Sequence, residues 1–166
     1  VVFGSASAIS SVNLDDVAQG MGGFKITGEL ANDAAGISVS SAGDVNGDGL
    51  DDLIVWADEA DPGGNSYAGE SYVVFGKADG TQVNLSDVAA GSGGFIINGI
   101  DPDDRSGRSV SGAGDVNGDG FDDIIVSADL NDEGGGTAGG LRVPGSRVRG
   151  RGLAPDRDGG IELAPV

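Results

Sequence analysis

The sequence predicts an all-β protein built from a repeated unit of sheet, on three observations. Glycine makes up 33 of the 166 residues without the every-third spacing of collagen, which is typical of turns between many short strands. The apolar segments are short, rich in β-branched residues and bounded by Gly, Asn and Asp. Several segments also return after 71 or 72 residues, a period longer than the solenoid units of about 20 to 50 residues. A unit of this length can hold four strands.

Four kinds of strand are expected in each unit. The first consists of small residues and suits a place where several sheets converge. The second is a run of β-branched residues, which indicates burial on both faces of its sheet. The fourth alternates apolar with polar residues and suits a more exposed outer position. In order of kind, the predicted strands are 36–43 with 107–114, 53–55 with 124–126, 71–75, and 24–26 with 95–97.

The connections between the strands are predicted to be short turns and exposed loops. Residues 13–18 return almost unchanged as 84–89, and each copy is expected to form one helical turn, capped by Asn13 in the first copy and Ser86 in the second. The loops rich in Asp, Gly and Pro are expected to project from the sheets as surfaces available for binding, and they comprise 58–70, 100–106 and 129–140.

Composition excludes several classes of function. A formal net charge of −18 argues against partners that need positive charge, namely nucleic acid and anionic membranes, and favours the binding of cations. The absence of Cys and His removes disulfides, thiolate ligands and the usual general base, and leaves hard oxygen ligands. No apolar run reaches the roughly 20 residues of a membrane span. Because the chain starts at Val1 without an initiator Met or a signal peptide, we expect it to be part of something longer.

Residues 44–52 predict a calcium-binding loop, because oxygen-bearing side chains occupy positions one, three, five and nine around a forced turn. The same pattern recurs at 115–123 in the same register. Gly49 and Gly120 permit the bend, and three carboxylates against a doubly charged ion leave each site near −1. Two calcium ions are therefore expected. Their predicted ligands are the side chains of Asp44, Asn46, Asp48 and Asp52 with the backbone oxygen of Leu50, and those of Asp115, Asn117, Asp119 and Asp123 with the backbone oxygen of Phe121.

Two other calcium-binding loops begin with a similar pattern but do not fit this sequence. An EF-hand needs Glu at position twelve between two helices, and a dockerin loop needs Asp there before a helix, whereas position twelve here is Val55 or Val126 in an apolar strand. The loop should therefore close a β-hairpin. A single copy would fit an ordinary polar turn, but duplication in register favours calcium. Asp51 and Asp122, at position eight, are expected to face away from the ion.

At the calcium loop and the strand that follows it, in residues 43–55 and 114–126, the sequence resembles the FG-GAP repeats of integrin α chains and many bacterial surface proteins. Val-Val-Phe-Gly at 73–76 also fits this family. The resemblance implies an all-β fold, a β-propeller fragment of about two four-stranded antiparallel blades with calcium-binding hairpin loops. Residues 1–140 would hold the last two strands of one blade, one complete blade and the first two strands of the next, with the predicted binding loops opposite the calcium.

Residues 141–166 form an irregular tail rich in Arg, Gly and Pro, where the repeat predicts another Val-Val-Phe-Gly strand. Our hypothesis is a shifted reading frame or an artificial junction, and the alternative is a natural flexible tail. Because two blades cannot close a ring that needs roughly four to eight, bare sheet edges are expected. We therefore expect contact with other blades of the same propeller, or self-association.

The predicted function is a calcium-binding β-propeller module of a secreted or cell-surface protein, mediating adhesion or protein or glycan recognition outside the cell. The alternative is a non-catalytic scaffold domain of a larger secreted hydrolase, in which calcium is purely structural. Without His no Ser/His/Asp set is possible, no phosphate-binding Gly-Lys-Ser or Gly-Lys-Thr segment occurs, and no enzyme activity is expected. The expected partners are Ca²⁺ and a protein or glycan ligand, with neither nucleic acid nor membrane insertion.

Overall fold

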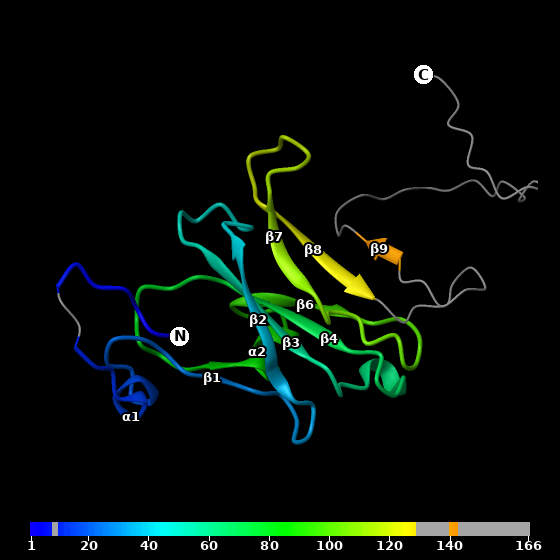
Figure 1. Cartoon of the computed structure of the whole chain (residues 1–166), viewed down its shortest axis with the longest axis horizontal. Coiled ribbons are helices and arrows are strands. Elements are labelled where there is room, and N and C mark those ends of the chain that lie inside the picture. The colour runs from blue at the N-terminus through cyan, green and yellow to red at the C-terminus, as the bar shows by residue number, and fades with distance from the viewer. Residues whose placement is uncertain (8–9, 129–139, 143–166) are drawn as a thin grey trace, which may run out of the picture.

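The structure is a computed structural model of the whole chain, and it describes residues 1–7, 10–128 and 140–142 (Figure 1). Within these residues the fold consists mostly of strands in antiparallel sheets, with two five-residue helices and one 3₁₀ turn, Pro62–Gly64. The expected all-β class is confirmed. No helix in this part of the chain combines the length and the apolar character that crossing a membrane requires.

A four-stranded antiparallel sheet lies at the centre of the molecule. Its strand order is β2-β3-β4-β6, so each strand pairs with the next one of the sheet along the chain. All four predicted kinds of strand therefore lie in one sheet. The strands are β2 (Ala35–Gly43), β3 (Asp52–Ala57), β4 (Glu70–Val74) and β6 (Gly94–Asn98).

A second sheet repeats the first part of the central one with the same register. It comprises β7 (Val110–Gly114), β8 (Asp123–Ala128) and β9 (Gly140–Arg142). The pair Val39↔Val55 in the central sheet corresponds, 71 residues later, to the pair Val110↔Val126. Even the irregularity before the hairpin loop is repeated. The third strand, β9, lies across the boundary expected at residue 140, and residues 129–139 and 143–166 of the predicted loop and tail lie outside the described residues.

The N-terminal residues make two small β-pairings beside the central sheet. Val2 bridges Gly23 in antiparallel fashion, and the Val1 amino group donates to the Phe24 carbonyl oxygen at 3.0 Å. Further along, β1 (Ile26–Thr27) pairs in parallel with β5 (Val83–Asn84).

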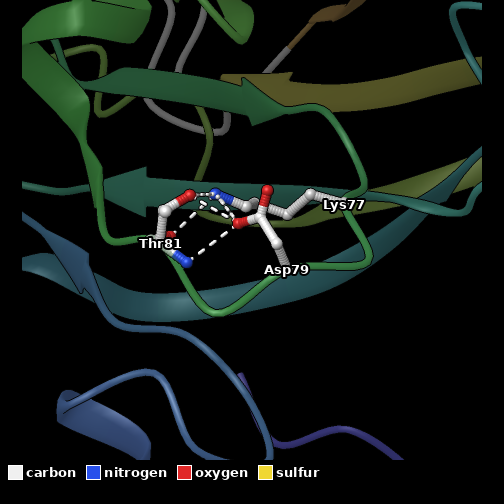
Figure 2. Close-up of polar contacts among 3 residues, drawn as sticks. All are labelled: Lys77, Asp79 and Thr81. Carbon is white, nitrogen blue, oxygen red and sulfur yellow. Dashed lines mark hydrogen bonds and ion pairs between the residues drawn. The ribbon is translucent and has the colours of Figure 1, made fainter.

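The turn from β4 to β5 is held by polar contacts shown in Figure 2. Lys77 Nζ lies 2.9 Å from Asp79 Oδ1, the Thr81 backbone N–H donates to the same oxygen at 2.8 Å, and Lys77 also donates to the Thr81 hydroxyl. The Lys77 ammonium lies 5.5 Å from the centre of the Phe24 ring, so this turn connects the N-terminal segment that contains Phe24 to the central sheet.

The two predicted helical turns are present, 71 residues apart. Helix α1 (Leu14–Ala18) is capped by Asn13, whose side-chain oxygen accepts from the Asp15 N–H at 3.0 Å, as expected. Helix α2 (Leu85–Ala89) is different, because its N-cap is Asn84 and Ser86 lies inside the helix. The expectation that Ser86 caps α2 is wrong, since the extended backbone of β5 ends at Asn84 and the helix begins at the next residue.

Strand β3 is buried on both faces, which confirms the prediction made from its run of β-branched residues. Because successive side chains of a strand point to opposite faces, its residues enter two different cores. Val55 belongs to the first core and Ile54 to the second, which joins the two sheets. The buried members are Val55, Ala57, Ala60, Tyr72, Val74, Leu85 and Val88 in the first core, and Ala42, Ile54, Val73, Val110, Ile124 and Val126 in the second.

Candidate metal-binding loops

Each predicted calcium loop is the connection of a β-hairpin, as expected from the sequence. Residues 44–51 join β2 to β3, residues 115–122 join β7 to β8, and both loops project from the same end of their sheets (Figure 1). The 71-residue repeat therefore brings the two acidic loops to neighbouring places at one edge of the molecule.

The first loop is folded around the carboxylate of Asp44. Its Oδ1 accepts from the Gly47 N–H at 2.7 Å and the Asp48 N–H at 3.1 Å, while its Oδ2 accepts from the Gly49 N–H at 2.9 Å. Asn46 Oδ1 accepts from the Asp48 N–H at 2.8 Å. Gly47 has φ of 76° and Gly49 of 87°, a left-handed conformation that only glycine adopts without cost. The sequence thus folds this turn locally.

The second loop has the same conformation. Asp115 accepts from the Gly118, Asp119 and Gly120 N–H groups at 2.7, 3.1 and 2.9 Å, the same three distances as in the first loop. Asn117 Oδ1 again accepts from the Asp119 N–H, at 2.9 Å. The side-chain amides differ, since Asn46 donates to Asp48 whereas Asn117 donates to Asp123. The backbone turn is the same in both loops, so the duplication seen in the sequence is also a duplication of backbone structure.

The carboxylates at position nine anchor the loops to the strands. Asp52 is fully buried, and its two oxygens accept from the Val45 N–H at 2.9 Å and the Gly76 N–H at 2.7 Å. Burial raises the pKa of Asp52 above its ordinary value, and these two N–H groups partly offset the rise. Asp123 accepts from the Val116 N–H at 2.8 Å and, more weakly, from the Asn117 N–H at 3.3 Å.

The donor chemistry of both loops fits calcium, because every predicted ligand is a hard oxygen. Within the part of the chain that the structure describes, which includes both loops, no group of three or more Asp, Glu, His or Cys side chains is arranged to hold a metal ion. The carboxylates share each loop but are engaged with backbone N–H groups, as for Asp44 and Asp52. Leu50 and Phe121, whose backbone oxygens complete the predicted sets, lie exposed at the loop surface.

Asp122 joins the two loops, a role that sequence reasoning missed. Its Oδ2 accepts from the Asp44 N–H at 2.9 Å, and its own N–H donates to the Asp44 carbonyl oxygen at 3.1 Å. The Phe121 ring also lies so close to Gly47 that a side chain there would clash with it. Asp122 was expected to face away from its own loop; it contacts the neighbouring one. The available signal was the recurrence of Asp at position eight in both copies.

The opposite end of the central sheet carries a second acidic group, formed by Glu29, Glu70 and Tyr72. The buried Tyr72 hydroxyl lies 2.8 Å from Glu29 Oε2 and 2.6 Å from Glu70 Oε2. Burial is the main cause that raises the pKa of Tyr72, and the hydrogen bonds to the two carboxylates raise it further. Burial also raises the pKa of Glu70. Because a phenol carries one hydrogen, it can donate to only one of the two carboxylates at a time. Sequence reasoning did not find this group, since Glu29 lies in a loop 43 residues before Tyr72, whereas Glu70 is on the same strand as Tyr72.

Two of the predicted binding loops, 58–70 and 100–106, form one surface at this end. The Asp103 N–H donates to the Ser66 carbonyl oxygen at 2.9 Å, and the Arg105 N–H to the Tyr67 carbonyl oxygen at 3.1 Å. The Arg105 guanidinium lies 3.2 Å from an Asp58 carboxylate oxygen and 5.7 Å from the centre of the Tyr67 ring. Trp56 is a buried packing residue, and its indole N–H donates to the Ser106 carbonyl oxygen at 2.9 Å.

The repeated sheets and their acidic hairpin loops define a class of β-repeat protein, and comparison with known proteins gives the family. The model of the FG-GAP repeat matches residues 35–74 and 106–143, which contain β2 to β4 and β7 to β9. The chain is 32% identical over 114 residues to integrin alpha-5 of Xenopus laevis. That alignment covers 66% of this chain and 10% of the integrin. Residues 35–74 and 106–143 are therefore two repeats of the FG-GAP family, and these repeats are integrin alpha-like and of the β-propeller type.

Proposed function

We propose that this chain is a calcium-binding β-propeller module of a secreted or cell-surface protein, and that it mediates adhesion or the recognition of a protein or glycan. The observation that carries the proposal is the pair of acidic hairpin loops, each within an FG-GAP match, in which Asp44 and Asp115 accept the same three backbone hydrogen bonds. The likeness to an integrin alpha chain supports an extracellular, non-catalytic role. The chain spans about a tenth of that relative, so the partner of the whole protein belongs to the proposal as well.

Calcium is proposed to bind within each loop and to stiffen the hairpin. When bound, it would supply two positive charges to a loop that has three predicted carboxylate ligands, in a chain whose net charge is −18. The folded turn supports this role, because Asp44 and Asp115 already order the loop backbone around the acidic side chains. The residues that would hold the ions are those predicted from the sequence, at 44, 46, 48, 50 and 52 and at 115, 117, 119, 121 and 123.

Recognition is proposed for the opposite end of the central sheet, on the surface formed by loops 58–70 and 100–106. Tyr67 is 42% exposed there. The Asp61 carboxylate accepts a hydrogen bond from the Tyr67 backbone N–H at 2.8 Å, and the Arg105 guanidinium lies against the Tyr67 ring. Aromatic and Arg side chains that are held rigidly lose little entropy on binding and often dominate interface energies. These features support a protein or glycan partner at this surface.

The calcium part of the proposal is tested by thermal unfolding with and without calcium. Binding to the native state alone stabilises a protein by about 2.7 kcal/mol when the ligand exceeds its dissociation constant a hundredfold. Calcium is therefore expected to raise Tm by several degrees, and the double variant Asp48→Asn with Asp119→Asn is expected to lose that rise. Asp51→Asn, which removes one charge from the same loop at a position outside the predicted ligand set, is the matched control. An unchanged Tm in millimolar calcium would contradict the assignment of these loops.

A further inference from the structure

Asn is followed directly by Gly at three places in the chain, and this pair of residues can modify itself. The backbone nitrogen of the Gly attacks the side-chain amide carbon of the Asn, and it can approach because Gly carries no side chain that blocks the way. The reaction is helped by an acceptor for the proton of that nitrogen and by a donor to the amide oxygen. The three pairs are Asn46–Gly47, Asn98–Gly99 and Asn117–Gly118.

The first acidic loop brings both groups to Asn46. The attacking nitrogen is that of Gly47, and its hydrogen is donated to Asp44 Oδ1 at 2.7 Å. The Asp48 N–H donates to Asn46 Oδ1 at 2.8 Å, and this oxygen is where negative charge develops during the attack. Because that bond reaches two residues along the chain, it folds the Asn46 amide back over the peptide bond to Gly47.

The second acidic loop repeats this arrangement at Asn117. The Gly118 N–H donates to Asp115 Oδ1 at 2.7 Å, and the Asp119 N–H donates to Asn117 Oδ1 at 2.9 Å. Each loop therefore supplies a carboxylate at the attacking nitrogen and a backbone N–H at the oxygen of the amide under attack.

The third pair has the same two residues in a different setting. Asn98 is the last residue of β6 and pairs with Glu70 of β4, so its backbone is extended. The Gly99 N–H donates to the neutral carbonyl oxygen of Gly69 at 2.8 Å. In an extended strand the side chain points away from the following peptide nitrogen. This pair is thus an internal reference for the other two.

We propose that Asn46 and Asn117 are sites of self-catalysed deamidation, with Asp44 and Asp115 as the bases. In the first loop, Asp44 takes the Gly47 proton as the Gly47 nitrogen bonds to the Asn46 amide carbon. The bond from this carbon to Nδ2 breaks, and Nδ2 leaves as ammonia with a proton from water. The hydroxide that remains takes the proton back from Asp44.

Water then opens the five-membered ring and leaves Asp or isoaspartate at position 46. In total one water is consumed and one ammonia is released, with no oxidation or reduction. Each event adds a negative charge to a chain whose net charge is already −18. Isoaspartate also inserts one carbon into the backbone of the turn. The inference goes beyond the proposed function and does not depend on calcium.

The reaction is followed by mass spectrometry of the intact folded chain, incubated in chelator and then digested with trypsin. Cleavage after Lys and Arg separates the three pairs into residues 26–77, 78–105 and 109–142. Asn46 and Asn117 are expected to deamidate about tenfold faster than Asn98 or more, since a positioned base contributes roughly 10²- to 10⁴-fold in enzymes.

The variant Asp44→Ala distinguishes a catalytic loop from a protective one. Deamidation at Asn46 is expected to slow about tenfold, whereas Asn117 in the same molecule keeps its rate. Asp115→Ala should give the converse. If the hydrogen bonds of Asp44 only held the loop rigid, their removal would instead speed the reaction at Asn46.

Asp44→Asn keeps an acceptor at the same place without the charge, and it should also slow Asn46. The matched control is Asp51→Ala, which removes a carboxylate of the same loop that accepts neither of the two hydrogen bonds. It should leave both rates unchanged. Circular dichroism checks that each variant is folded. An unchanged or faster rate at Asn46 without the Asp44 carboxylate, or wild-type rates no higher than that of Asn98, overturns the proposal.

Discussion

At the residue scale, Tyr72 couples two carboxylates that come from different parts of the chain. Glu70 lies on β4 with Tyr72, and Glu29 lies in the loop between β1 and β2. Burial raises the pKa of Glu70 most strongly, and the charges of Glu29, Asp33 and Asp61 add to the rise, while the Tyr72 hydroxyl lowers it. Burial also raises the pKa of Asp33. A hydrogen bond from the Leu30 backbone N–H partly offsets this rise, and the charges of Glu29 and Asp61 add to it. This end of the sheet therefore favours a bound proton.

The pH dependence of stability follows from the sign of these shifts. A carboxyl group whose pKa is raised on folding stabilises the fold below its unfolded pKa, and that contribution is lost as pH rises through the folded pKa. The free energy of unfolding is therefore expected to increase as the pH falls through the raised pKa of Glu70 toward the ordinary pKa of a Glu carboxyl. In Glu70→Gln this increase should be smaller, because the amide does not titrate. Urea unfolding of both proteins at a series of pH values measures the difference.

Asp79 provides a control of opposite sign. The Thr81 hydroxyl and Lys77 hold its pKa below the ordinary value, so its contribution is lost as pH falls through that lowered pKa (Figure 2). In Asp79→Asn the gain in stability as the pH falls through the raised pKa of Glu70 should persist unchanged. If Glu70→Gln and the wild type respond identically to pH, the Tyr72 group does not bind a proton in the manner described.

At the element scale, the two acidic hairpins are joined to each other as well as to their own strands. The bond from Asp122 to the Asp44 backbone links residues 78 apart, and it holds the β7–β8 hairpin against the β2–β3 hairpin. Asp51 has the equivalent position in the first loop, and within the described ranges it makes no such contact with another loop. One sequence position thus has two different environments in one chain.

Replacing Asp122 by Ala is expected to destabilise the fold by about 1 to 2 kcal/mol, because it leaves the Asp44 N–H without its charged acceptor. Asp51→Ala removes the same side chain from the equivalent position and is expected to change stability by about 0.5 kcal/mol or less, when measured at a low protein concentration. The unfolding free energies of the two variants in urea make the comparison. Equal losses would show that the link between the loops contributes nothing.

At the scale of the whole molecule, stability depends on the core shared by the two sheets. Ile54 is fully buried between them, together with Val73 and Ile124. The repeated strands create this core only when neighbouring sheets pack face to face, because each sheet is too thin to bury its own apolar residues.

Ile54→Ala is expected to cost about 2 to 5 kcal/mol, the range for truncating a buried aliphatic side chain. Ile37→Ala, on the same sheet but 61% exposed, is expected to cost about 0.5 kcal/mol or less. Urea unfolding with a common slope for both variants measures the two values. A loss at Ile54 as small as that at Ile37 would mean that the two sheets do not share a core in solution.

The sequence by itself determined the elements and the turns. The glycine-bounded segments gave the strands of the central sheet, and Asn13 gave the cap of α1, because both depend on local backbone preferences. The two acidic loops were also found from sequence, since an Asp at position one with glycines at four and six folds the turn using only its own residues. The family followed from the same short segments.

Only the tertiary structure decided how these elements meet. The link from Asp122 to Asp44, the contact of Glu29 with Tyr72 and the cavity lined by Val1 and Val39 bring together residues that are distant in sequence, and nothing local specifies such pairs. The cap of α2 was mispredicted for a related reason, because pairing of β5 with β1 extends the strand to Asn84 and so fixes where the helix begins. Local hydrogen bonds can be inferred from residue order, whereas packing of one repeat against another depends on the geometry of whole sheets.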